Sequence, residues 1–271
     1  MRIVRAFASI GVKKVRLTGG EPMLRRDLLA IIAGIRAIPE IEEITMTTNG
    51  QHLPGQSRAL REAGLNRLNI SVDSLQPERY AAITGGGSLS CVLTGIEEAY
   101  EAGFDSLKLN VVLLRGQNDD ETGDFLALTK DRNLSVRFIE YMPLGETDQA
   151  DLRVTGAELL QKHPELVPVA PSYRGQPARD YQLPGAIGRV GMIDPVSHRF
   201  CADCNRVRVM SDGMLRPCLG SNEEFSLKEA LAQEGDAALL AVIAEAIKHK
   251  PETHCFDEGF TVEKNMSRIG G

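Results

Sequence analysis

Short runs in which apolar and polar residues alternate, each followed by an amphipathic stretch, most constrain the fold of this chain. Five such runs lie at residues 14–17, 43–47, 67–73, 106–113 and 135–141. Helical spacing marks the stretches between them, and in one of these Leu28, Ile32 and Ile35 recur on one face before Pro39. Strand–helix–strand recurrence about every 25–40 residues predicts βα units around a parallel sheet.

The alternation within the predicted strands indicates how the sheet is covered. Strands that are buried on both faces of an α/β sheet are almost continuously apolar. Here Arg16 lies between Val15 and Leu17, and polar residues separate the apolar ones in the later runs as well. One face can therefore pack on helices while the other collects Arg, Thr, Asn and Lys. A barrel turns that polar face inward around a wet cavity, so we predict a barrel over residues 1–142. An open sheet with a solvated polar face is the alternative.

Charge and hydropathy exclude two classes of partner. The chain has 31 Lys and Arg against 37 Asp and Glu, a net charge of −6, which argues against general nucleic-acid binding. It contains no uninterrupted apolar window long enough to span a membrane. Lys13 and Lys14 come too early for a secretory signal. We expect a cytoplasmic protein.

The character of the sequence changes after Met142. Frequent prolines and weak periodicity over residues 143–190 predict a loop-rich connector with one helix near Gly156–Lys162. A cysteine segment and a helical region from Leu227 to about His249 follow. We therefore divide the chain at residue 142, with 143–271 forming the connector, the cysteine segment and a terminal tail.

Three of the five cysteines crowd into 18 residues, which indicates a metal centre. Cys201 and Cys204 form a CxxC pair, and Cys218 follows after a Gly-containing turn. Three thiolates can hold a [4Fe-4S] cluster with one iron left open. A structural zinc site needs four ligands, so zinc is the alternative if a further residue joins the cysteines. The candidates for that fourth zinc ligand are His198, Asp203 and Cys255.

Two further motifs indicate a ligand site. Arg206 and Arg208 alternate beside the CxxC pair, and guanidinium groups suit phosphate or purine contacts. At the end of the first predicted strand, Gly19 and Gly20 allow close backbone approach, and Glu21 supplies a carboxylate. The Thr47-Thr48-Asn49-Gly50 turn ends the next strand in the same way. Ordinary turns between strands and helices are the alternative for both glycine motifs.

Seven motifs in order resemble one enzyme family. They are LTGGEP, TTNG, NISVDSL, the Lys108-Leu-Asn strand, RFIEYMPLG, FCADCNRVRV followed by LRPCL, and a terminal Gly-Gly. Together they resemble the GTP 3′,8-cyclases, radical S-adenosylmethionine (SAM) enzymes. These open molybdenum-cofactor biosynthesis by converting GTP to (8S)-3′,8-cyclo-7,8-dihydroguanosine 5′-triphosphate. The resemblance covers nearly the whole chain. It implies an α/β fold, an incomplete (βα)6-type radical SAM barrel with a C-terminal Fe-S cluster-binding extension.

The resemblance also implies site residues by position. Those that match SAM contacts are Gly20, Glu21, Ser71 and Met142. Those that match GTP contacts are Arg16, Thr47, Lys108, Arg206, Val207 and Arg208. The ligands of the second [4Fe-4S] cluster, whose open iron meets guanine, match Cys201, Cys204 and Cys218. The tail that promotes SAM cleavage matches Gly270 and Gly271.

Three of these positions also have structural alternatives. Ser71 can cap a helix, Lys108 can pair with Asp73, and Met142 can belong to the core. The same resemblance implies partners, which are GTP, SAM, an electron donor, a second copy of the chain in a homodimer and, as the next enzyme, cyclic pyranopterin monophosphate synthase.

One departure from the family pattern limits what the resemblance implies. The family carries a Cys-x3-Cys-x2-Cys motif upstream of GGEP that holds the SAM-cleaving cluster, whereas this sequence has no cysteine before Cys91. We expect the first βα unit to be missing, as in an N-terminally truncated chain. The alternative to the active cyclase is then an inactive GTP- and Fe-S-binding fragment. A radical SAM peptide-modifying enzyme is disfavoured by the Arg-Val-Arg segment and the Gly-Gly tail.

Overall fold

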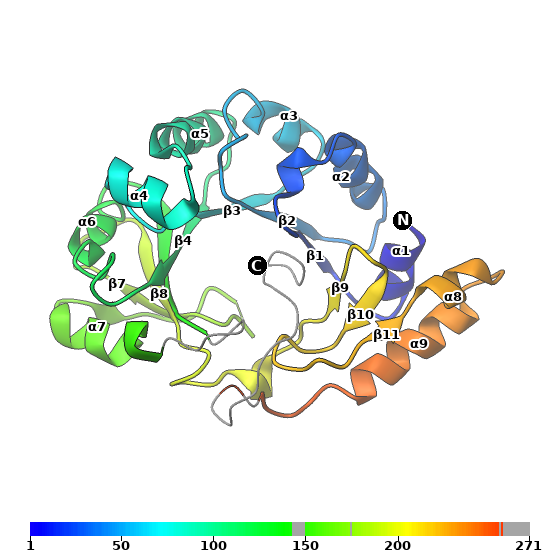
Figure 1. Ribbon diagram of the computed structural model, residues 1–271. Helices are drawn as coiled ribbons and strands as arrows, with labels where there is room; N and C mark the ends of the chain where they lie inside the picture. The colour runs from blue at the N-terminus through cyan, green and yellow to red at the C-terminus, as the bar shows by residue number, and fades with distance from the viewer. Residues whose placement is uncertain (143–149, 174, 255, 257–271) are drawn as a thin grey trace.

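A curved, mostly parallel sheet forms the main body of the molecule (Figure 1). The computed structural model describes residues 1–142, 150–173, 175–254 and 256. Six neighbouring strands run parallel, and they are β1 (Lys14–Leu17), β2 (Glu43–Thr48), β3 (Arg67–Ser71), β4 (Leu107–Leu113), β5 (Leu134–Glu140) and β8 (Arg189–Ile193). Two antiparallel strands extend the sheet beyond β8, namely β7 (Arg179–Gln182) and β6 (Val167–Pro168).

Helices surround the outer, convex side of this sheet (Figure 1). They are α1 (Arg2–Ser9), α2 (Leu28–Arg36), α3 (Ser57–Glu62), α4 (Pro77–Thr84), α5 (Leu89–Glu101), α6 (Thr122–Ala127) and α7 (Gly156–Lys162). Short 3-10 turns lie at η1 (Pro22–Leu24), η2 (Ala150–Leu152) and η3 (Cys201–Asp203). Across the described residues, no helix has the length and hydropathy needed to cross a membrane.

The five strands predicted from alternation are confirmed, with ends that differ by at most two residues. The predicted helix at Gly156–Lys162 is also confirmed, and Thr155 and Glu158 form a capping box at its start. The prediction of a loop-rich connector over residues 143–190 is incomplete. Strands β6 and β7 lie within this segment, β8 begins at its end, and all three join the main sheet. They were missed because they are short and lie among prolines and glycines.

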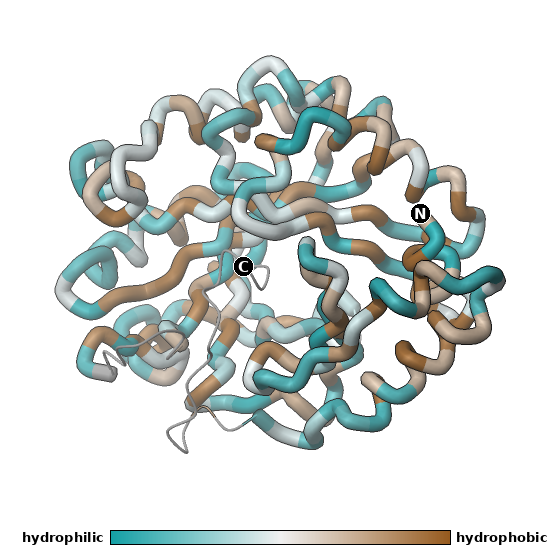
Figure 2. Tube along the Cα trace, turned by 45° about the vertical axis from the view of Figure 1, so that its right-hand side comes forward, coloured by the Kyte–Doolittle hydropathy of each residue, from teal (hydrophilic) through white to brown (hydrophobic). Residues whose placement is uncertain are grey.

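The inward and outward faces of the sheet differ as the alternation predicts. Outward-facing residues such as Ile44, Leu68 and Leu109 are at most 1% exposed and pack with helix residues such as Ile32 and Val92. Each such burial stabilises the fold by roughly 1.5–3 kcal/mol. Figure 2 shows hydrophobic and hydrophilic residues following one another along the strands. The polar residues that alternate with these apolar ones in β1 to β5 therefore face the hollow of the curved sheet.

The sheet is not closed into a complete barrel. Its strand order begins at β1 and ends at β6, and within the described ranges no pairing joins these two strands. This open arrangement confirms the incomplete barrel.

A small C-terminal extension lies beside β1 (Figure 1). It contains an antiparallel sheet of β9 (Arg208–Val209), β10 (Met214–Arg216) and β11 (Phe225–Ser226), together with the helices α8 (Lys228–Ala232) and α9 (Ala237–Lys248). A second apolar core joins Phe7 of α1 to Leu239 and Ile243 of α9. Arg2 also donates to Asp236 at 2.8 Å and to the Leu231 carbonyl at 2.8 Å. Helix α1 therefore holds the extension against the main body.

Candidate active site

The register of the main sheet gathers polar side chains into layers on its inner face. Residues paired across neighbouring strands point to the same side of a sheet, so each set of register partners forms one layer. The layers contain, in order, Arg16 with Thr45, Thr47 with Asn69 and Lys108, and Ser71 with Asn110 and Arg137. All three GTP positions that the resemblance places in the barrel, Arg16, Thr47 and Lys108, therefore share the inner face.

A basic cavity of about 550 Å³ opens at the end of the sheet where the strands begin. Six of its lining residues are basic and two are acidic. The basic ones are Lys13, Lys14, Arg67, Lys108, Arg137 and Arg189, and the acidic ones are Glu43 and Asp180. This volume lies in the range of small-molecule sites, and the excess of cations favours an anionic ligand.

Lys108 is buried in this cavity, and it forms no ion pair with any residue that the structure describes. Its side chain is only 6% exposed. Burial, followed by the repulsion of nearby cations such as Arg137 and Arg67, lowers the pKa of Lys108 to about 6. The alternative pairing with Asp73 is wrong, because no described ion pair joins the two side chains, and Asp73 instead accepts the Val112 N–H at 2.8 Å.

Arg137 and Tyr173 are site residues that the sequence analysis missed. Lys14 lies 4.5 Å and Lys108 lies 5.5 Å from the centre of the Tyr173 ring. Burial lowers the pKa of Arg137, and the neighbouring Tyr173 and Asp180 partly offset that effect. Arg137 is 4% exposed, and its Nε has no partner among the described residues. The alternation within residues 135–141 could have placed Arg137 on the polar face of the sheet. Tyr173 lies in a loop, and no sequence pattern indicated its position.

The cysteine segment places Cys204 beside two cations. Its Sγ accepts from Arg206 Nη2 at 3.5 Å and from Lys250 Nζ at 3.6 Å. Burial raises the pKa of the Cys204 thiol, but the Arg206 guanidinium, the Arg206 backbone N–H and Lys250 together bring it below its usual value. Burial raises the pKa of Cys218, and the neighbouring Cys204 and Cys201 thiols add to that increase. The three cysteines therefore lie close enough to interact electrostatically.

Arg16 links the inner face of the sheet to this segment. The Arg16 side chain stays accessible to solvent in the hollow of the sheet, but the protein that surrounds it lowers its pKa, and repulsion from Arg137 and Arg206 adds to the effect. Burial also lowers the pKa of Arg208 to about 10, with contributions from Arg206 and Arg16 that the Cys218 and Cys204 thiols partly offset. The structure thus brings Arg16, Arg206 and Arg208 into one group of mutually repelling cations.

Val207 points away from this group of arginines. Its side chain packs against the second apolar core, with Phe7 and Leu215. Of the Arg-Val-Arg segment, the two arginines therefore face the site while the valine anchors the segment.

The residues matched to SAM contacts occupy the opposite ends of β1 and β3 from the basic cavity. Glu21 accepts from Thr48 Oγ1 at 2.8 Å and from the Asn49 N–H at 2.7 Å, so it ties together the turns after β1 and β2. Gly20 precedes it and is exposed. Ser71 ends β3 and does not cap a helix, because α4 begins after Gln76.

Met142 packs with Met210 and Phe256 in a small apolar cluster, in agreement with the core alternative. Gly270 and Gly271, the predicted tail residues, lie outside the described residues.

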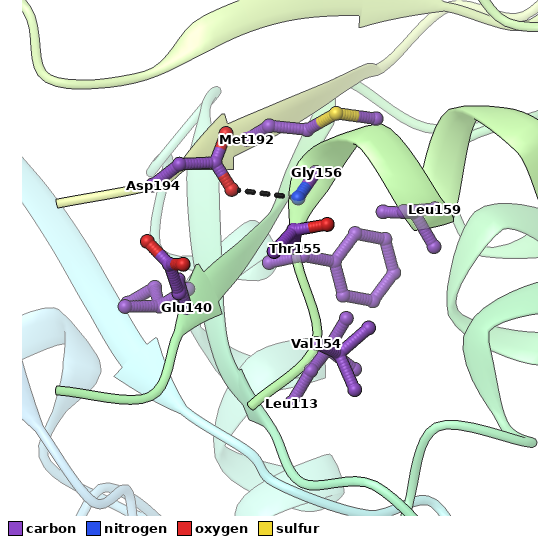
Figure 3. Close-up of a pocket in the computed structure, with 10 residues that line it drawn as sticks. Leu113, Glu140, Val154, Thr155, Gly156, Leu159, Met192 and Asp194 are labelled. Carbon is purple, nitrogen blue, oxygen red and sulfur yellow. Dashed lines mark hydrogen bonds between the residues drawn. The ribbon is translucent and has the colours of Figure 1, made fainter. Parts of the chain in front are cut away.

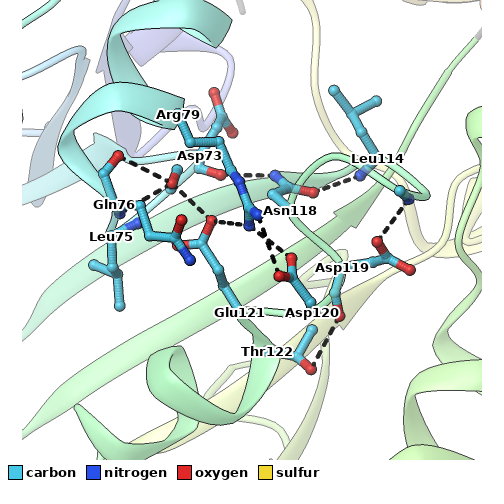
Figure 4. Close-up of polar contacts among 12 residues, drawn as sticks. Asp73, Leu75, Gln76, Arg79, Leu114, Asn118, Asp119, Asp120, Glu121 and Thr122 are labelled. Carbon is cyan, nitrogen blue, oxygen red and sulfur yellow. Dashed lines mark hydrogen bonds and ion pairs between the residues drawn. The ribbon is translucent and has the colours of Figure 1, made fainter.

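A buried polar network holds the loop that follows β3 (Figure 4). Glu121 is 1% exposed and accepts from Ser74 Oγ at 2.7 Å, from the Leu75 N–H at 2.6 Å and from Arg79 Nη1 at 2.6 Å. Asn118 donates to the Asp73 carbonyl at 2.7 Å. The loop between β4 and α6 therefore fixes the Asp-Ser-Leu part of the NISVDSL motif.

A second hollow lies between β5, β8 and the start of α7, where polar contacts connect these elements (Figure 3). It leaves no volume that a water molecule can occupy. Asp194 accepts the Gly156 N–H at 2.8 Å and pairs with Arg179 at 2.6 Å. Glu140 accepts the backbone N–H groups of Val196 and Ser197, each at 2.9 Å. These carboxylates attach the segment after β8 and helix α7 to the sheet.

The cysteine donor set has the chemistry of an iron–sulfur site, since three thiolates can hold a four-iron cluster. A tetrahedral zinc ion with Zn–S bonds of about 2.3 Å brings its sulfur ligands within about 3.8 Å of one another. In the part of the chain that the structure describes, no three His, Cys, Asp or Glu side chains converge on one metal position. A four-iron cluster binds each thiolate through a different iron and spaces its ligands more widely. Of the candidate fourth zinc ligands, Cys255 lies outside the described residues.

Comparisons with known proteins agree with both parts of the fold. The family model for the radical SAM superfamily matches residues 1–129, and the model for Molybdenum Cofactor Synthesis C matches residues 134–256. Streptococcus suis SuiB, solved with bound S-adenosylmethionine, superposes with a TM-score of 0.57 at 14% identity, over 89% of this chain and 57% of that one. At that identity the superposition supports the fold alone.

Two relatives are similar over nearly the whole chain. The GTP 3′,8-cyclase of Alkaliphilus oremlandii is 47% identical over 273 residues, which are 99% of this chain and 85% of that protein. The GTP 3′,8-cyclase of Alkaliphilus metalliredigens is also 47% identical, over 100% of this chain and 85% of that protein. With its radical SAM and molybdenum cofactor synthesis regions, the chain belongs to the GTP 3′,8-cyclase family.

Proposed function

We propose that this chain binds GTP between the inner face of its main sheet and its cysteine segment. The reaction is that of its family, the radical SAM conversion of GTP to (8S)-3′,8-cyclo-7,8-dihydroguanosine 5′-triphosphate. This is the first step of molybdenum cofactor biosynthesis. The protein therefore acts on a nucleoside triphosphate. Its site must bind both the strongly anionic triphosphate group and the purine base.

The meeting of Arg16 with Arg206 and Arg208 carries this proposal. Arg16 comes from the barrel and the other two come from the cysteine segment, yet Arg206 lowers the pKa of Arg16, and both Arg206 and Arg16 lower the pKa of Arg208. Bringing three guanidinium groups together costs free energy in the absence of an anion. A ligand that carries negative charge offsets the repulsion, so the group is organised for an anion that spans both parts of the chain.

The triphosphate belongs with the cations of the basic cavity. Lys108 and Arg137 are both buried, and both repel neighbouring cations. Lys14 lies on the same Tyr173 ring as Lys108. Phosphate oxygens would balance the charges of Lys108 and Arg137, whereas Lys14 already pairs with Glu43 at 2.6 Å. Guanidinium groups bind phosphate in a bidentate manner.

The guanine end of GTP belongs with the cysteine segment. Cys201, Cys204 and Cys218 would hold a [4Fe-4S] cluster. When bound, such a cluster supplies an open iron that can coordinate a nitrogen or oxygen atom of a base. Arg206 and Arg208 flank that position and can donate hydrogen bonds to the base edge or the sugar.

SAM and the remaining partners follow from the family. We assign the SAM methionine group to Gly20 and Glu21, and we assign further SAM contacts to Ser71 and Met142. The cytoplasm supplies GTP, SAM and an electron donor, and cyclic pyranopterin monophosphate synthase consumes the product. The Gly270–Gly271 tail, the homodimer and the domain boundary at residue 142 stay predictions.

A nucleotide titration tests the GTP site. Isothermal titration of the chain with GTP, GDP and guanosine is expected to give affinity that falls with each phosphate removed. Lys108→Ala is expected to weaken GTP binding at least about tenfold, since it removes a charge-assisted phosphate contact. Lys248→Ala is the matched control, because Lys248 is 73% exposed and lies far along the chain in α9. Equal GTP affinity in wild type and Lys108→Ala would contradict the assignment.

Turnover distinguishes the active enzyme from the binding fragment. This sequence contains no Cys-x3-Cys-x2-Cys motif. Anaerobic assays for 5′-deoxyadenosine and cyclised GTP, run beside the titration, separate the two functions. Binding with product supports the cyclase, and binding without product supports the GTP- and Fe-S-binding alternative.

A further inference from the structure

Lys250 reaches the cysteine segment from the end of helix α9. Its Nζ donates to Cys204 Sγ at 3.6 Å, to the Arg206 carbonyl at 2.8 Å and to the Pro217 carbonyl at 3.0 Å. An ammonium group has three N–H donors and no acceptor. Three acceptors therefore satisfy this ammonium, and its position is defined by all three.

The acceptors of Lys250 belong to two separate segments of the chain. Cys204 and Arg206 lie in the segment that follows η3, whereas Pro217 directly precedes Cys218. One side chain therefore connects the CxxC pair to the third cysteine. No described disulfide joins these segments, since Cys201, Cys204 and Cys218 are all free thiols.

Lys250 lies just beyond the end of helix α9, which is anchored in the second apolar core. Leu239, Ile243 and Ala246 of this helix are fully buried in the second apolar core. The Lys250 N–H donates to the Ile247 carbonyl at 3.1 Å, so the residue extends the last turn of the helix. The ammonium is thus held against the cysteines by packing that is independent of any bound cluster.

The charge of Lys250 acts directly on a sulfur that we assign as a cluster ligand. Hydrogen bonds to cluster sulfurs and nearby positive charge favour the reduced, more negative state of an iron–sulfur cluster. Cys204 receives two such bonds, one from Arg206 and one from Lys250. Of these two donors, Lys250 is the one that also contacts the segment before Cys218, through its hydrogen bond to the Pro217 carbonyl.

We propose that Lys250 is a positioning residue of the C-terminal cluster, which holds the two cysteine segments together and places a charged N–H against Cys204. This proposal rests on the proposed function, because it requires a cluster at Cys201, Cys204 and Cys218. Residues that orient the ligands of a metal centre typically change its retention about tenfold to a hundredfold when they are removed.

Anaerobic reconstitution of the full chain with iron and sulfide provides the test. The variants are Lys250→Met, which keeps the stem without charge or donors, Lys250→Gln, which keeps donors without charge, and Lys250→Arg, which keeps both. Lys248→Met is the matched control, with the same charge change two residues earlier on an exposed side chain. Three quantities are measured: the rate of iron loss to a chelator, the cluster reduction potential by EPR-monitored titration, and the melting temperature of the iron-free chain.

In Lys250→Met we expect iron loss about tenfold faster and a more negative reduction potential than in wild type. Lys250→Gln is expected to recover iron retention and the potential only in part, because it keeps hydrogen-bond donors without the charge, and Lys250→Arg is expected to recover both. Lys248→Met should match wild type. Unchanged iron loss and potential in both Lys250→Met and Lys250→Gln would overturn the proposal, as would a change confined to the melting temperature. A wild-type chain that takes up no iron would instead remove the cluster assignment itself, and the role of Lys250 with it.

Discussion

At the scale of single residues, the site contains two buried cations, Lys108 and Arg137, that form no ion pair with another described residue. Lys108 shows this most clearly, because burial and like charges lower its pKa to about 6. Near pH 7.5 its amine is therefore mostly neutral before ligand binds. A triphosphate beside it favours the ammonium form and raises the pKa again.

Proton uptake on GTP binding is the expected consequence. Above pH 6 the empty site holds mostly neutral Lys108, so GTP binding at pH 7.5 should take up close to one proton. Below about pH 5 the amine is already charged, and the uptake at this residue should vanish. Isothermal titration in two buffers with different ionisation enthalpies measures the uptake, and Lys108→Met should abolish it. Identical heats in both buffers at pH 7.5 would contradict this account of Lys108.

Tyr173 is expected to organise the phosphate cations. Tyr173→Phe keeps the ring beside Lys14 and Lys108 and loses only the polar hydroxyl near Arg137, so GTP affinity should fall about two- to fivefold. Tyr173→Leu also removes two cation–π contacts, each worth roughly 0.5–2 kcal/mol, and should cost tenfold or more. Titration with GTP and with guanosine checks the location, because guanosine binding should be the same in both variants. An equal loss with guanosine would place Tyr173 outside the phosphate site.

The predictability of these residues depends on where they lie. Arg16 and Lys108 interrupt apolar strands, so alternation alone puts them on the inner face. Arg137 obeys the same alternation and was open to the same inference. Tyr173 lies in a loop between β6 and β7, whose path depends on tertiary packing, so no local pattern could place it beside Lys14.

At the scale of elements, buried carboxylates attach loops to the sheet. Glu121 shows the principle, because its two oxygens bind two residues of the loop after β3 and the side chain of Arg79. That loop follows Ser71 and thus positions one end of the inner face.

Removing Glu121 should therefore destabilise the fold. Glu121→Ala removes the short acceptor of the buried Ser74 hydroxyl and the acceptor of the Leu75 N–H, and it leaves Arg79 without its buried partner. We expect a loss of about 3 kcal/mol in the free energy of unfolding. Asp120→Ala is the matched control: Asp120 pairs with the same Arg79 but is 62% exposed, so its loss should cost less than about 1 kcal/mol. Urea denaturation of both variants measures the difference. Similar losses in the two variants would show that Glu121 has no special structural role.

The elements themselves were predictable only in part. The first five strands carry strict alternation and stand between amphipathic helices, so pattern and spacing identified them. Strand β8 contains Gly191, where a Cβ would lie only 3.1 Å from Arg137 Cγ. A glycine is needed there because β5 and its Arg137 approach the β8 backbone closely. That close approach is a tertiary effect, so the local sequence pattern does not reveal β8 as a strand.

At the scale of the whole molecule, one sheet spans both regions that match family models. Strand β5 lies in the molybdenum cofactor synthesis region, yet it pairs along its full length with β4 of the radical SAM region. The extension then returns to the N-terminal helix α1 through the second apolar core. The sequence indicated a barrel and an extension, but the way in which they join depends on contacts between distant segments.

The joining of these two parts into a single GTP site is the central claim, and EPR of the reconstituted, reduced chain tests it most directly. The account predicts about four irons per chain and a spectrum that changes on addition of GTP but not of ATP. In Lys108→Ala the same change should require at least about tenfold more GTP, because the phosphates are bound in the barrel while the base meets the cluster. A GTP-insensitive spectrum, or one zinc ion in place of iron, would contradict the claim that the barrel and the cysteine segment form one site.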